Sequence, residues 1–295
     1  MCDDTDLAEF RRRGGLSRRE FGAAGMATGL VACTQGSTGA ASAASDSATS
    51  AMAGEMVSIP TEDGTMDAYW VHPATPSAAV IIWPDIAGIR DAFKAMAGRL
   101  AGEGYAVLVA NPYYRDTPAP QFADFKDFLD TGGFQKVTPW REKLDANSIG
   151  RDAKTLVQWL DLQSAVDTSK GIGTQGYCMG GPFTVWTAAA VPARVRGSAS
   201  FHGAGIVREG PQSPHLMLKD TKASFLFAIA QNDDAKQPEA KDMLRKAAEA
   251  AGRPAEIEVY PADHGWCVLD TPVYDKAQAE KAWSRLNALY RTALA

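Results

Sequence analysis

Runs of consecutive apolar residues alternate along the chain with stretches in which apolar residues recur every three or four positions. The runs predict strands that are buried on both faces, and the second pattern predicts helices that bury one face. Strands are expected at residues 78–83, 105–110, 171–175, 197–201, 224–230 and 256–260. Helices are expected at residues 91–103, 148–162, 182–191, 238–251 and 271–294. Before them, residues 55–60 and 65–72 surround an Asp-Gly turn and predict a hairpin.

The regular alternation of strand and helix predicts an α/β fold in one domain over residues 55–295, with a mostly parallel sheet and helices on both faces. Ligands bind such sheets at the carboxyl ends of the strands, so reactive residues are expected directly after strands. Residues 112–147 form a long connection that is rich in aromatic side chains. Such connections are often functional, but a helix over residues 122–129 that packs on the core explains this one equally well.

The composition is that of an ordinary globular protein, with 45% hydrophobic and 22% charged residues among 295. The formal net charge is -5, and no long basic stretch follows the N-terminal region. Nucleic acid is therefore not expected as a partner, because its phosphates are bound by clustered basic residues. The sequence also shows no metal-ligand cluster and no phosphate-cradling loop, so neither a metal nor a cofactor is expected.

The N-terminal region differs in character from the rest of the chain. Residues 17–21 read Ser-Arg-Arg-Glu-Phe, which is a twin-arginine export motif. A mildly apolar stretch at residues 22–32 follows, too short and too rich in glycine to span a bilayer. It ends Leu-Val-Ala-Cys at Cys33, which resembles the lipobox of bacterial lipoproteins and predicts cleavage before Cys33 and lipidation of its thiol.

Residues 1–33 are therefore expected to be a twin-arginine export signal with a lipobox, and residues 34–54 a flexible linker of Ser, Ala, Gly and Thr. A signal peptide cut near Ala44 without lipidation, or a disordered tail, are the alternatives. Export by this route places the domain in the periplasm or on a membrane-tethered lipoprotein. A lipid anchor at Cys33 would be its only membrane contact.

Cysteine usage agrees with that route. The chain has four cysteines, at positions 2, 33, 178 and 267. Twin-arginine export carries folded proteins, so the domain folds in the reducing cytoplasm. Once the signal is removed and Cys33 is lipidated, the remaining two cysteines are too few for a disulfide framework.

The segment that points to chemistry is residues 176–181, Gly-Tyr-Cys-Met-Gly-Gly. It lies between an expected strand and an expected helix, with glycines two positions before and after the cysteine. This is the nucleophile-elbow pattern of α/β-hydrolases. Gly176 and Gly180 remove Cβ atoms for which so sharp a turn has little room. Cys178 is therefore the candidate nucleophile, where serine is more usual.

The partners of an elbow nucleophile follow it in the order acid, then histidine. Among the four histidines, only His264 lies late in the chain and after a strand, although a surface-loop role is the alternative. Two acids follow the strand expected at residues 224–230. Asp233, three residues past the strand end, is preferred, and Asp234 is the alternative.

His202 also follows an expected strand, in the sequence Ser-Phe-His-Gly-Ala-Gly at residues 200–205. It is a candidate for lining the pocket. A histidine in such a place more often only forms a hydrogen bond within a loop.

Taken together, these residues resemble the dienelactone hydrolase family. The resemblance rests on the cysteine elbow, the later aspartate and the His-Gly-Trp sequence at residues 264–266. Residues 80–90 are similar to the family's first strand and the loop after it, and residues 104–107 and 111–115 to its second. The resemblance covers residues 55–292 and implies an α/β-hydrolase fold without a large separate cap domain.

The resemblance implies hydrolysis of an ester or lactone, as by a carboxymethylenebutenolidase, through a thioacyl-enzyme. Cys178 would attack the carbonyl carbon, His264 would remove the thiol proton, and Asp233 would orient the imidazole. The amides of Ile86 and Met179 would form the oxyanion hole. A thiolate nucleophile favours activated esters such as enol lactones, because a poor alkoxide leaves less readily than the thiolate itself.

Two further positions are implied by the resemblance. Asp85 stands where the family typically carries a glutamate close to the nucleophile, and it would hold the thiol proton if its shorter side chain reaches that far. Arg115 matches an arginine that the family uses to bind a substrate carboxylate, with a surface arginine as the alternative.

The chain also departs from the family. A second arginine would follow His264, but residues 265–270 contain none. This departure weakens the case for a substrate carboxylate. Trp266 and Cys267 stand there instead and predict a pocket of different shape, in which Cys267 is a small buried apolar residue.

The expected partner is a small-molecule ester or lactone. The sequence does not fix the oligomeric state, and a monomer is the working expectation. A ligand-binding lipoprotein without turnover is the alternative function, against which the complete Cys178, Asp233 and His264 set speaks. A thiol redox pair of Cys178 and Cys267 is weaker, because the chain has no Cys-x-x-Cys motif.

Overall fold

The computed structural model describes residues 52–295. The predicted export signal, including Cys33, and the linker up to residue 51 lie outside the described residues. Between residues 52 and 295, no helix is long and apolar enough to cross a membrane.

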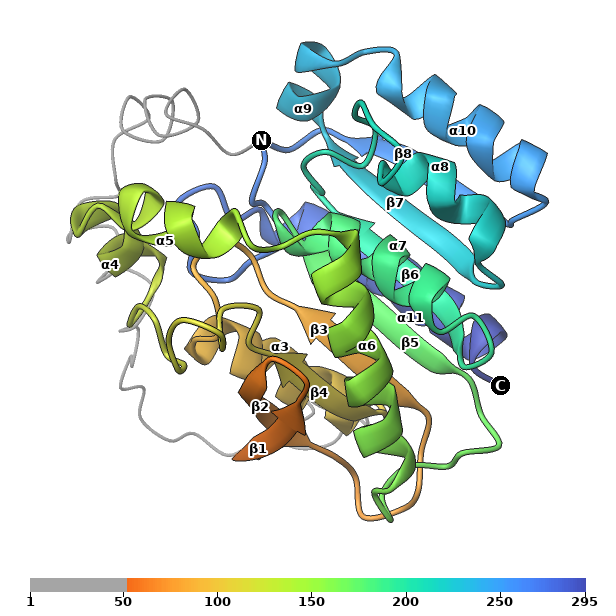
Figure 1. The fold of residues 1–295 in the computed structure, drawn as a ribbon. Helices are drawn as coiled ribbons and strands as arrows, with labels where there is room; N and C mark the ends of the chain where they lie inside the picture. The colour runs from red at the N-terminus through yellow and green to blue at the C-terminus, as the bar shows by residue number, and fades with distance from the viewer. Residues whose placement is uncertain (1–51) are drawn as a thin grey trace, which may run out of the picture.

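An eight-stranded sheet runs through the described chain (Figure 1). Its strands are β1 (Glu55–Thr61), β2 (Gly64–Val71), β3 (Ala79–Trp83), β4 (Ala106–Ala110), β5 (Ile172–Tyr177), β6 (Val195–Phe201), β7 (Ser224–Ala230) and β8 (Ala255–Tyr260). They lie in the order β1-β2-β4-β3-β5-β6-β7-β8. Strand β2 is antiparallel to β1 and β4, and all other neighbours are parallel. The mostly parallel sheet that the sequence predicts is confirmed.

Helices cover both faces of this sheet (Figure 1). One face is packed by α3 (Asp91–Gly102) and α11 (Lys276–Ala293). The other face is packed by α6 (Ala146–Asp161), α7 (Gly180–Ala190), α8 (Pro214–Met217), the short 3-10 helix η1 (Leu218–Asp220) and α10 (Ala240–Ala251). In β3, Ile81 points to the α6 and α7 side while Val80 and Ile82 point to the α3 side. Because both faces are covered, β3 and β4 are apolar at every position, which explains their unbroken apolar runs, while β5 and β6 also bury small polar residues such as Thr174 and Ser198.

The last helix and the segment after β7 differ from the sequence prediction. The last helix begins at Lys276 rather than at residue 271, because the Asp275 side chain caps it by accepting a hydrogen bond from the Gln278 amide. Helix α9 (Gln231–Lys236) was not predicted. It starts directly after β7 and places Asp233 and Asp234 in its first turn.

The aromatic connection between β4 and α6 forms a small core of its own. It contains α4 (Phe125–Asp130), close to the predicted helix, and α5 (Gly133–Arg141), which was not predicted. Aromatic side chains from this segment pack on one another and on the loop after β3, in a cluster of Ile86, Ala87, Tyr113, Phe122, Phe125, Phe128, Phe134 and Val137. The connection is therefore packed and also covers a loop at the carboxyl edge of the sheet.

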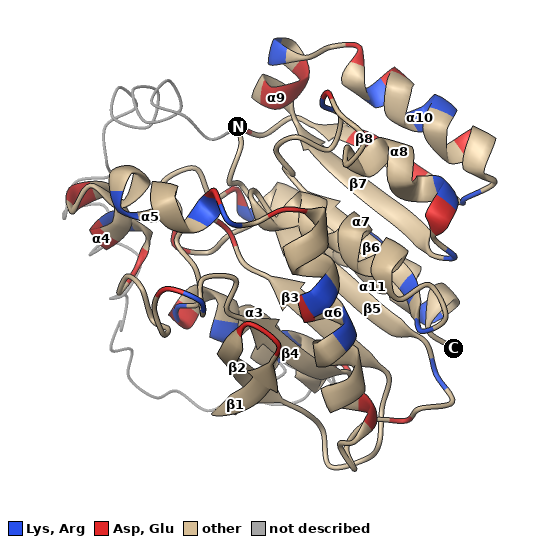
Figure 2. Cartoon of the chain, in the orientation of Figure 1, with Lys and Arg blue, Asp and Glu red and all other residues tan. Residues whose placement is uncertain are grey.

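Charged residues on the outer helices are mixed in sign. Figure 2 shows basic and acidic residues together on α10, where Arg245 is ion-paired with Asp242. Such a helix presents an ordinary solvated face, not the basic stripe that nucleic-acid binding requires.

The turn between β5 and α7 brings backbone into very close contact. Cys178 has a φ of 52°, a left-handed conformation that is uncommon outside glycine. A Cβ on Gly176 would lie 2.0 Å from the Gly180 carbonyl oxygen, and a Cβ on Gly180 would lie 2.4 Å from the Trp83 carbonyl oxygen. Both glycines are therefore required by contact with backbone atoms, which cannot move aside as a side chain can.

A buried arginine joins the loops at the same edge of the sheet. The Arg90 side chain is fully buried and donates two hydrogen bonds to Asp85, at 2.7 and 2.8 Å, and two to Asp270, at 2.7 and 2.8 Å. Asp270 also accepts a hydrogen bond from the Phe125 amide at 2.9 Å. Burial disfavours the charged guanidinium, but the two carboxylates outweigh it and raise the pKa of Arg90 above its ordinary value. This Arg90 network ties the loop after β3, the loop after β8 and the start of α4 together.

We predict that Gly176→Ala lowers the free energy of unfolding by at least about 2 kcal/mol, because the new methyl group overlaps backbone. The matched control is Gly150→Ala in the middle of α6. There a Cβ meets only Ala190 Cβ at 3.5 Å, and alanine is favoured over glycine in a helix by about 0.5–1 kcal/mol. Chemical denaturation of both variants checks this, and equal stabilities would contradict the close contact at the elbow.

We predict that Arg90→Met lowers the free energy of unfolding by about 3–5 kcal/mol, because it leaves the buried Asp85 carboxylate without its cation. Arg285→Ala is the control. It breaks an exposed pair with Glu256, which contributes less than about 1 kcal/mol. Urea denaturation measures both, and a loss at Arg90 no larger than at Arg285 would show that the network contributes little.

Candidate active site

The backbone of Cys178 is held on both sides. Its amide donates to the Phe201 carbonyl and to His202 Nδ1, both at 3.1 Å. Its carbonyl accepts hydrogen bonds from the Gly181 amide at 3.1 Å and from the Ala204 amide at 3.3 Å. The residue is 4% exposed. Its position directly after β5 and two residues before α7 is therefore fixed by the neighbouring strand and by the helix that follows.

His264 and Asp233 are in direct contact. His264 Nδ1 lies 2.7 Å from Asp233 Oδ2, and the His264 amide donates to Asn232 Oδ1 at 2.8 Å. Since the carboxylate accepts, Nδ1 carries the proton and Nε2 is the nitrogen left to act as a base. Asp234 instead accepts two hydrogen bonds from Lys241 Nζ, at 2.7 and 2.9 Å. Of the two acids that the sequence left open, Asp233 is thus the one that contacts His264.

His202 lies between the cysteine and the histidine loop. Its ring contacts the His264 ring edge-on, with 4.8 Å between centroids, and the Trp266 ring at 5.2 Å. Burial, and after it the proximity of His264, lowers the pKa of His202 well below its ordinary value. The ring is therefore neutral near pH 7. The contacts of His202 connect Cys178 to the His264–Asp233 pair.

The two residues whose amides are expected to form an oxyanion hole, Ile86 and Met179, both contact Tyr113, which the sequence did not single out. The Tyr113 hydroxyl donates to the Ile86 carbonyl at 2.9 Å and lies 3.2 Å from Met179 Sδ. It therefore contacts both residues whose amides are in question. Tyr113 lies within the aromatic connection and within residues 111–115, and its place three residues after the end of β4 was the available signal.

Asp85 does not have the surroundings expected of it. Both of its carboxylate oxygens accept hydrogen bonds from Arg90, and Oδ1 also accepts one from the Ala87 amide at 2.9 Å. The prediction that it holds the thiol proton is therefore not supported by its contacts, since its shorter side chain is used within the Arg90 network.

Arg115 is engaged in a different network. Its guanidinium donates to Asp63 in the hairpin turn and to Asp152 on α6, with closest distances of 2.7 Å to each. It also lies over the Tyr114 ring, 4.5 Å from the centroid. Because every nitrogen of the group is used on these carboxylates, the predicted role of Arg115 in binding a substrate carboxylate is not supported.

Trp266 and Cys267 lie beneath the surface. Trp266 is fully buried and stacks on Tyr260, with 5.2 Å between centroids. Cys267 lines a cavity of about 60 Å³ between α3 and α11, and burial raises the pKa of its thiol well above the ordinary value. Neither Cys178 nor Cys267 forms a disulfide. Cys267 is a small buried residue, as the sequence predicts. Trp266 packs against the His202 ring, with 5.2 Å between centroids.

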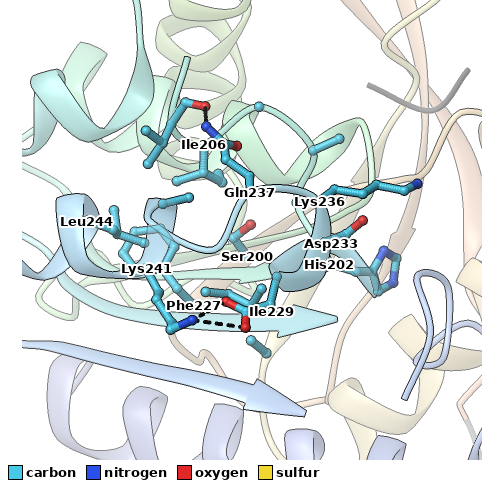
Figure 3. Close-up of a pocket in the computed structure, with 17 residues that line it drawn as sticks. Ser200, His202, Ile206, Phe227, Ile229, Asp233, Lys236, Gln237, Lys241 and Leu244 are labelled. Carbon is cyan, nitrogen blue, oxygen red and sulfur yellow. Dashed lines mark hydrogen bonds and ion pairs between the residues drawn. The ribbon is translucent and has the colours of Figure 1, made fainter. Parts of the chain in front are cut away.

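A larger cavity, of about 130 Å³, lies beside Asp233 (Figure 3). Ser200, His202 and Asp233 line one part of it, and the Asp234–Lys241 pair lines another (Figure 3). Cys178 and His264 are not among its lining residues. The cavity therefore borders the acid of the candidate triad and not its nucleophile. Nowhere between residues 52 and 295, this cavity included, is a group of three or more His, Cys, Asp or Glu side chains placed to hold a metal ion.

Known proteins share this architecture. The fold is similar to a crystal structure titled "Putative Dienelactone Hydrolase" from Klebsiella pneumoniae, with a TM-score of 0.69 and 24% identity over 81% of this chain and 98% of that one. It is also similar to the dienelactone hydrolase from Anabaena variabilis, with a TM-score of 0.59 and 13% identity over 82% of this chain and 98% of that one. These likenesses establish an α/β-hydrolase fold.

Sequence comparison covers nearly the same part of the chain. A Methylorubrum extorquens protein named "Putative carboxymethylenebutenolidase" is 28% identical over 98% of this chain and 97% of its own length. A model of the dienelactone hydrolase family matches residues 66–294, which span β2 to the end of α11. The chain therefore belongs to the dienelactone hydrolase family.

Proposed function

We propose that this protein hydrolyses an ester or lactone, with Cys178 as nucleophile, His264 as base and Asp233 as the group that orients the imidazole. The observation that carries the proposal is the 2.7 Å contact between His264 Nδ1, on the loop after β8, and Asp233 Oδ2, in α9 directly after β7. Both lie at the same edge of the sheet as the cysteine elbow. The name of the M. extorquens relative supports the same reaction class.

In the first step, His264 Nε2 takes the thiol proton and Cys178 Sγ bonds to the carbonyl carbon of the ester. The carbonyl π electrons move onto oxygen, and the amides of Met179 and Ile86 stabilise that oxyanion. The carbon–oxygen bond to the alcohol then breaks, and the imidazolium gives its proton to the departing oxygen. A thioester on Cys178 remains.

In the second step, His264 takes a proton from water as the water oxygen bonds to the thioester carbon. The carbon–sulfur bond breaks, the acid product leaves, and the thiol is restored by the same proton. Asp233 stabilises the imidazolium in both steps and keeps its proton on Nδ1.

The local structure favours these roles. The nucleophile lies at the amino end of α7, where the unpaired amides and the helix dipole favour a thiolate and a developing oxyanion. Within the described residues, the Met179 and Ile86 amides take no part in backbone hydrogen bonds. Both donors are therefore available to a substrate oxygen.

The substrate class follows from the sulfur. A tetrahedral adduct of a thiolate and an ester expels whichever group leaves more readily, so an enolate or aryloxide departs where a simple alkoxide does not. A neutral substrate fits better than a carboxylate, because Arg115 is used by Asp63 and Asp152. The proposed substrate is therefore a neutral activated ester or enol lactone, taken up by a protein that acts as a monomer.

The location is proposed from residues 17–33 alone: export by the twin-arginine route and a lipid on Cys33. We expect the wild-type protein in the membrane fraction and Cys33→Ala in the soluble periplasmic fraction. Cell fractionation followed by immunoblotting measures this, and equal partition of both proteins would argue against lipidation.

We predict that Cys178→Ala lowers kcat/KM at least about 10³-fold on activated esters while the protein stays folded, because the covalent route is lost. Asp233→Asn is expected to lower it about 10³-fold, since the amide favours the wrong imidazole tautomer. Initial rates on aryl esters, an enol lactone and simple alkyl esters provide the measurement.

Asp234→Asn is the matched control, one residue along the same helix and ion-paired to Lys241. It should change kcat/KM by less than about threefold. Equal losses at Asp233 and Asp234 would contradict the assigned acid, and fast turnover of alkyl esters would contradict the substrate class. Ligand binding without any turnover by the wild type would favour the non-catalytic alternative.

A further inference from the structure

We propose that His202 is a positioning residue for the nucleophile: its neutral imidazole accepts a hydrogen bond from the Cys178 amide and holds Cys178 in its left-handed conformation. That conformation sets the direction of the Met179 amide, which is one donor of the proposed oxyanion hole. The proposal rests on the proposed function for its effect on rate, but the contacts of His202 stand by themselves.

Cys178 and His202 occupy equivalent places on neighbouring strands. Strands β5 and β6 are parallel and pair Tyr177 with Phe201, so each residue is the first after its strand. Both have positive φ, 52° for Cys178 and 41° for His202, and between residues 52 and 295 they are the only residues other than glycine that do. Two such conformations side by side indicate a local constraint, because each is unfavourable by itself.

The constraint on these two residues comes from the hydrogen bonds of their backbone amides. The His202 amide donates to the Ala228 carbonyl of β7 at 2.8 Å, which extends the sheet by one residue and fixes the His202 backbone. From that fixed backbone, Nδ1 accepts from the Cys178 amide at 3.1 Å. The Cys178 amide is thus shared between the Phe201 carbonyl and the imidazole.

The protonation state of the ring follows from this contact. An amide donates to Nδ1, so Nδ1 carries no proton and the proton of the neutral ring is on Nε2. His202 Nε2 has no hydrogen-bond partner among the residues that the structure describes. The ring is 1% exposed. A buried neutral ring that is already a fixed acceptor serves to hold geometry and does not move protons.

The choice of residue supports a role for the side chain. Glycine adopts positive φ without strain, and one stands next in the chain at Gly203. The left-handed position is nevertheless occupied by histidine. Gly203 stands at the next position for a different reason, because a Cβ there would lie 2.2 Å from Ser200 Oγ. If only the backbone conformation mattered, glycine would suffice at this position, so the imidazole side chain itself has a role.

The role of the imidazole is to fix the direction of the Met179 amide. The peptide group after Cys178 is planar, so its carbonyl and the Met179 N–H point in opposite directions. The carbonyl is held by the amides of Gly181 and Ala204, and the peptide before Cys178 is held by His202. With both peptides fixed, the Met179 N–H keeps one direction, which is the preorganisation that an oxyanion donor requires.

His202 also touches the base. Its ring packs edge-on against the His264 ring at 4.8 Å and against the Trp266 ring at 5.2 Å, and Figure 3 shows it beside Asp233. The same residue therefore sets the nucleophile's backbone and limits the rotation of the His264 ring.

The test compares His202→Asn with His202→Gly. Both residues tolerate positive φ, so the backbone is matched. Asparagine can place Oδ1 near the position of Nδ1 and accept from the Cys178 amide, whereas glycine has no acceptor. We expect kcat to fall about 10- to 100-fold in His202→Gly with little change in KM. We expect His202→Asn to recover at least about tenfold of that loss.

Two further readouts separate positioning from folding and from the proposed function. Thermal unfolding reports whether the variants fold. The rate at which iodoacetamide alkylates Cys178, located by peptide mass spectrometry across a pH series, reports the nucleophile without any substrate. It should fall in His202→Gly and recover in His202→Asn, even if the esters chosen prove not to be substrates.

Wild-type kcat and alkylation rate in His202→Gly would overturn the proposal and leave the triad standing. An asparagine variant as impaired as the glycine variant, with both folded, would also overturn it, because the acceptor would then not be the cause. Loss of hydrolysis in Cys178→Ala together with no effect of the His202 variants would refute the positioning role of His202 and leave the proposed hydrolase function intact.

Discussion

The left-handed turn at Cys178 is the constraint on which the site depends. It exists because Gly176 and Gly180 let backbone approach backbone at distances that no Cβ permits. Placing the cysteine there puts it at the amino end of α7 and beside the end of β6, where Phe201 and His202 share its amide. The proposed catalytic histidine and acid then need only follow strands farther along the sheet, and His264 after β8 and Asp233 after β7 do so. One forbidden Cβ on each side of the nucleophile thus determines where the chemistry can occur.

Much of this could be predicted from the sequence, since the buried strands β3 and β4 are unbroken apolar runs and the elbow has fixed glycine spacing. The preference for Asp233 over Asp234 rested on its distance past the strand, and the structure places Asp233 against His264. Helix α9, which carries both acids directly after β7, could not be predicted, because so short a helix leaves no clear periodic pattern. The role of Arg90 was hidden for a different reason: its partner Asp270 lies 180 positions away, and no local pattern reports such a contact.

The departures at Asp85 and Arg115 have one physical origin. Each residue was expected to face the reacting groups, and each is instead used in a buried or half-buried ion pair. Arg90 occupies both oxygens of Asp85, and Arg115 is held between Asp63 and Asp152. A charge removed from water needs a partner nearby, so these pairings take precedence over any weaker contact with substrate. Family resemblance located the positions, but the partners available in this chain decided what the side chains do.

The aromatic core around α4 and α5 has a consequence for how this enzyme can diversify. It packs beside the two cores that hold the sheet, and Ile86, Ala87, Tyr113 and the partly buried Met179 connect it to the reactive edge. Its outer side chains can therefore be exchanged without repacking the sheet. The loops joined by Arg90 cannot change in this independent way. Substitutions that change substrate specificity should accordingly accumulate in residues 112–147, while the elbow and its neighbours stay the same.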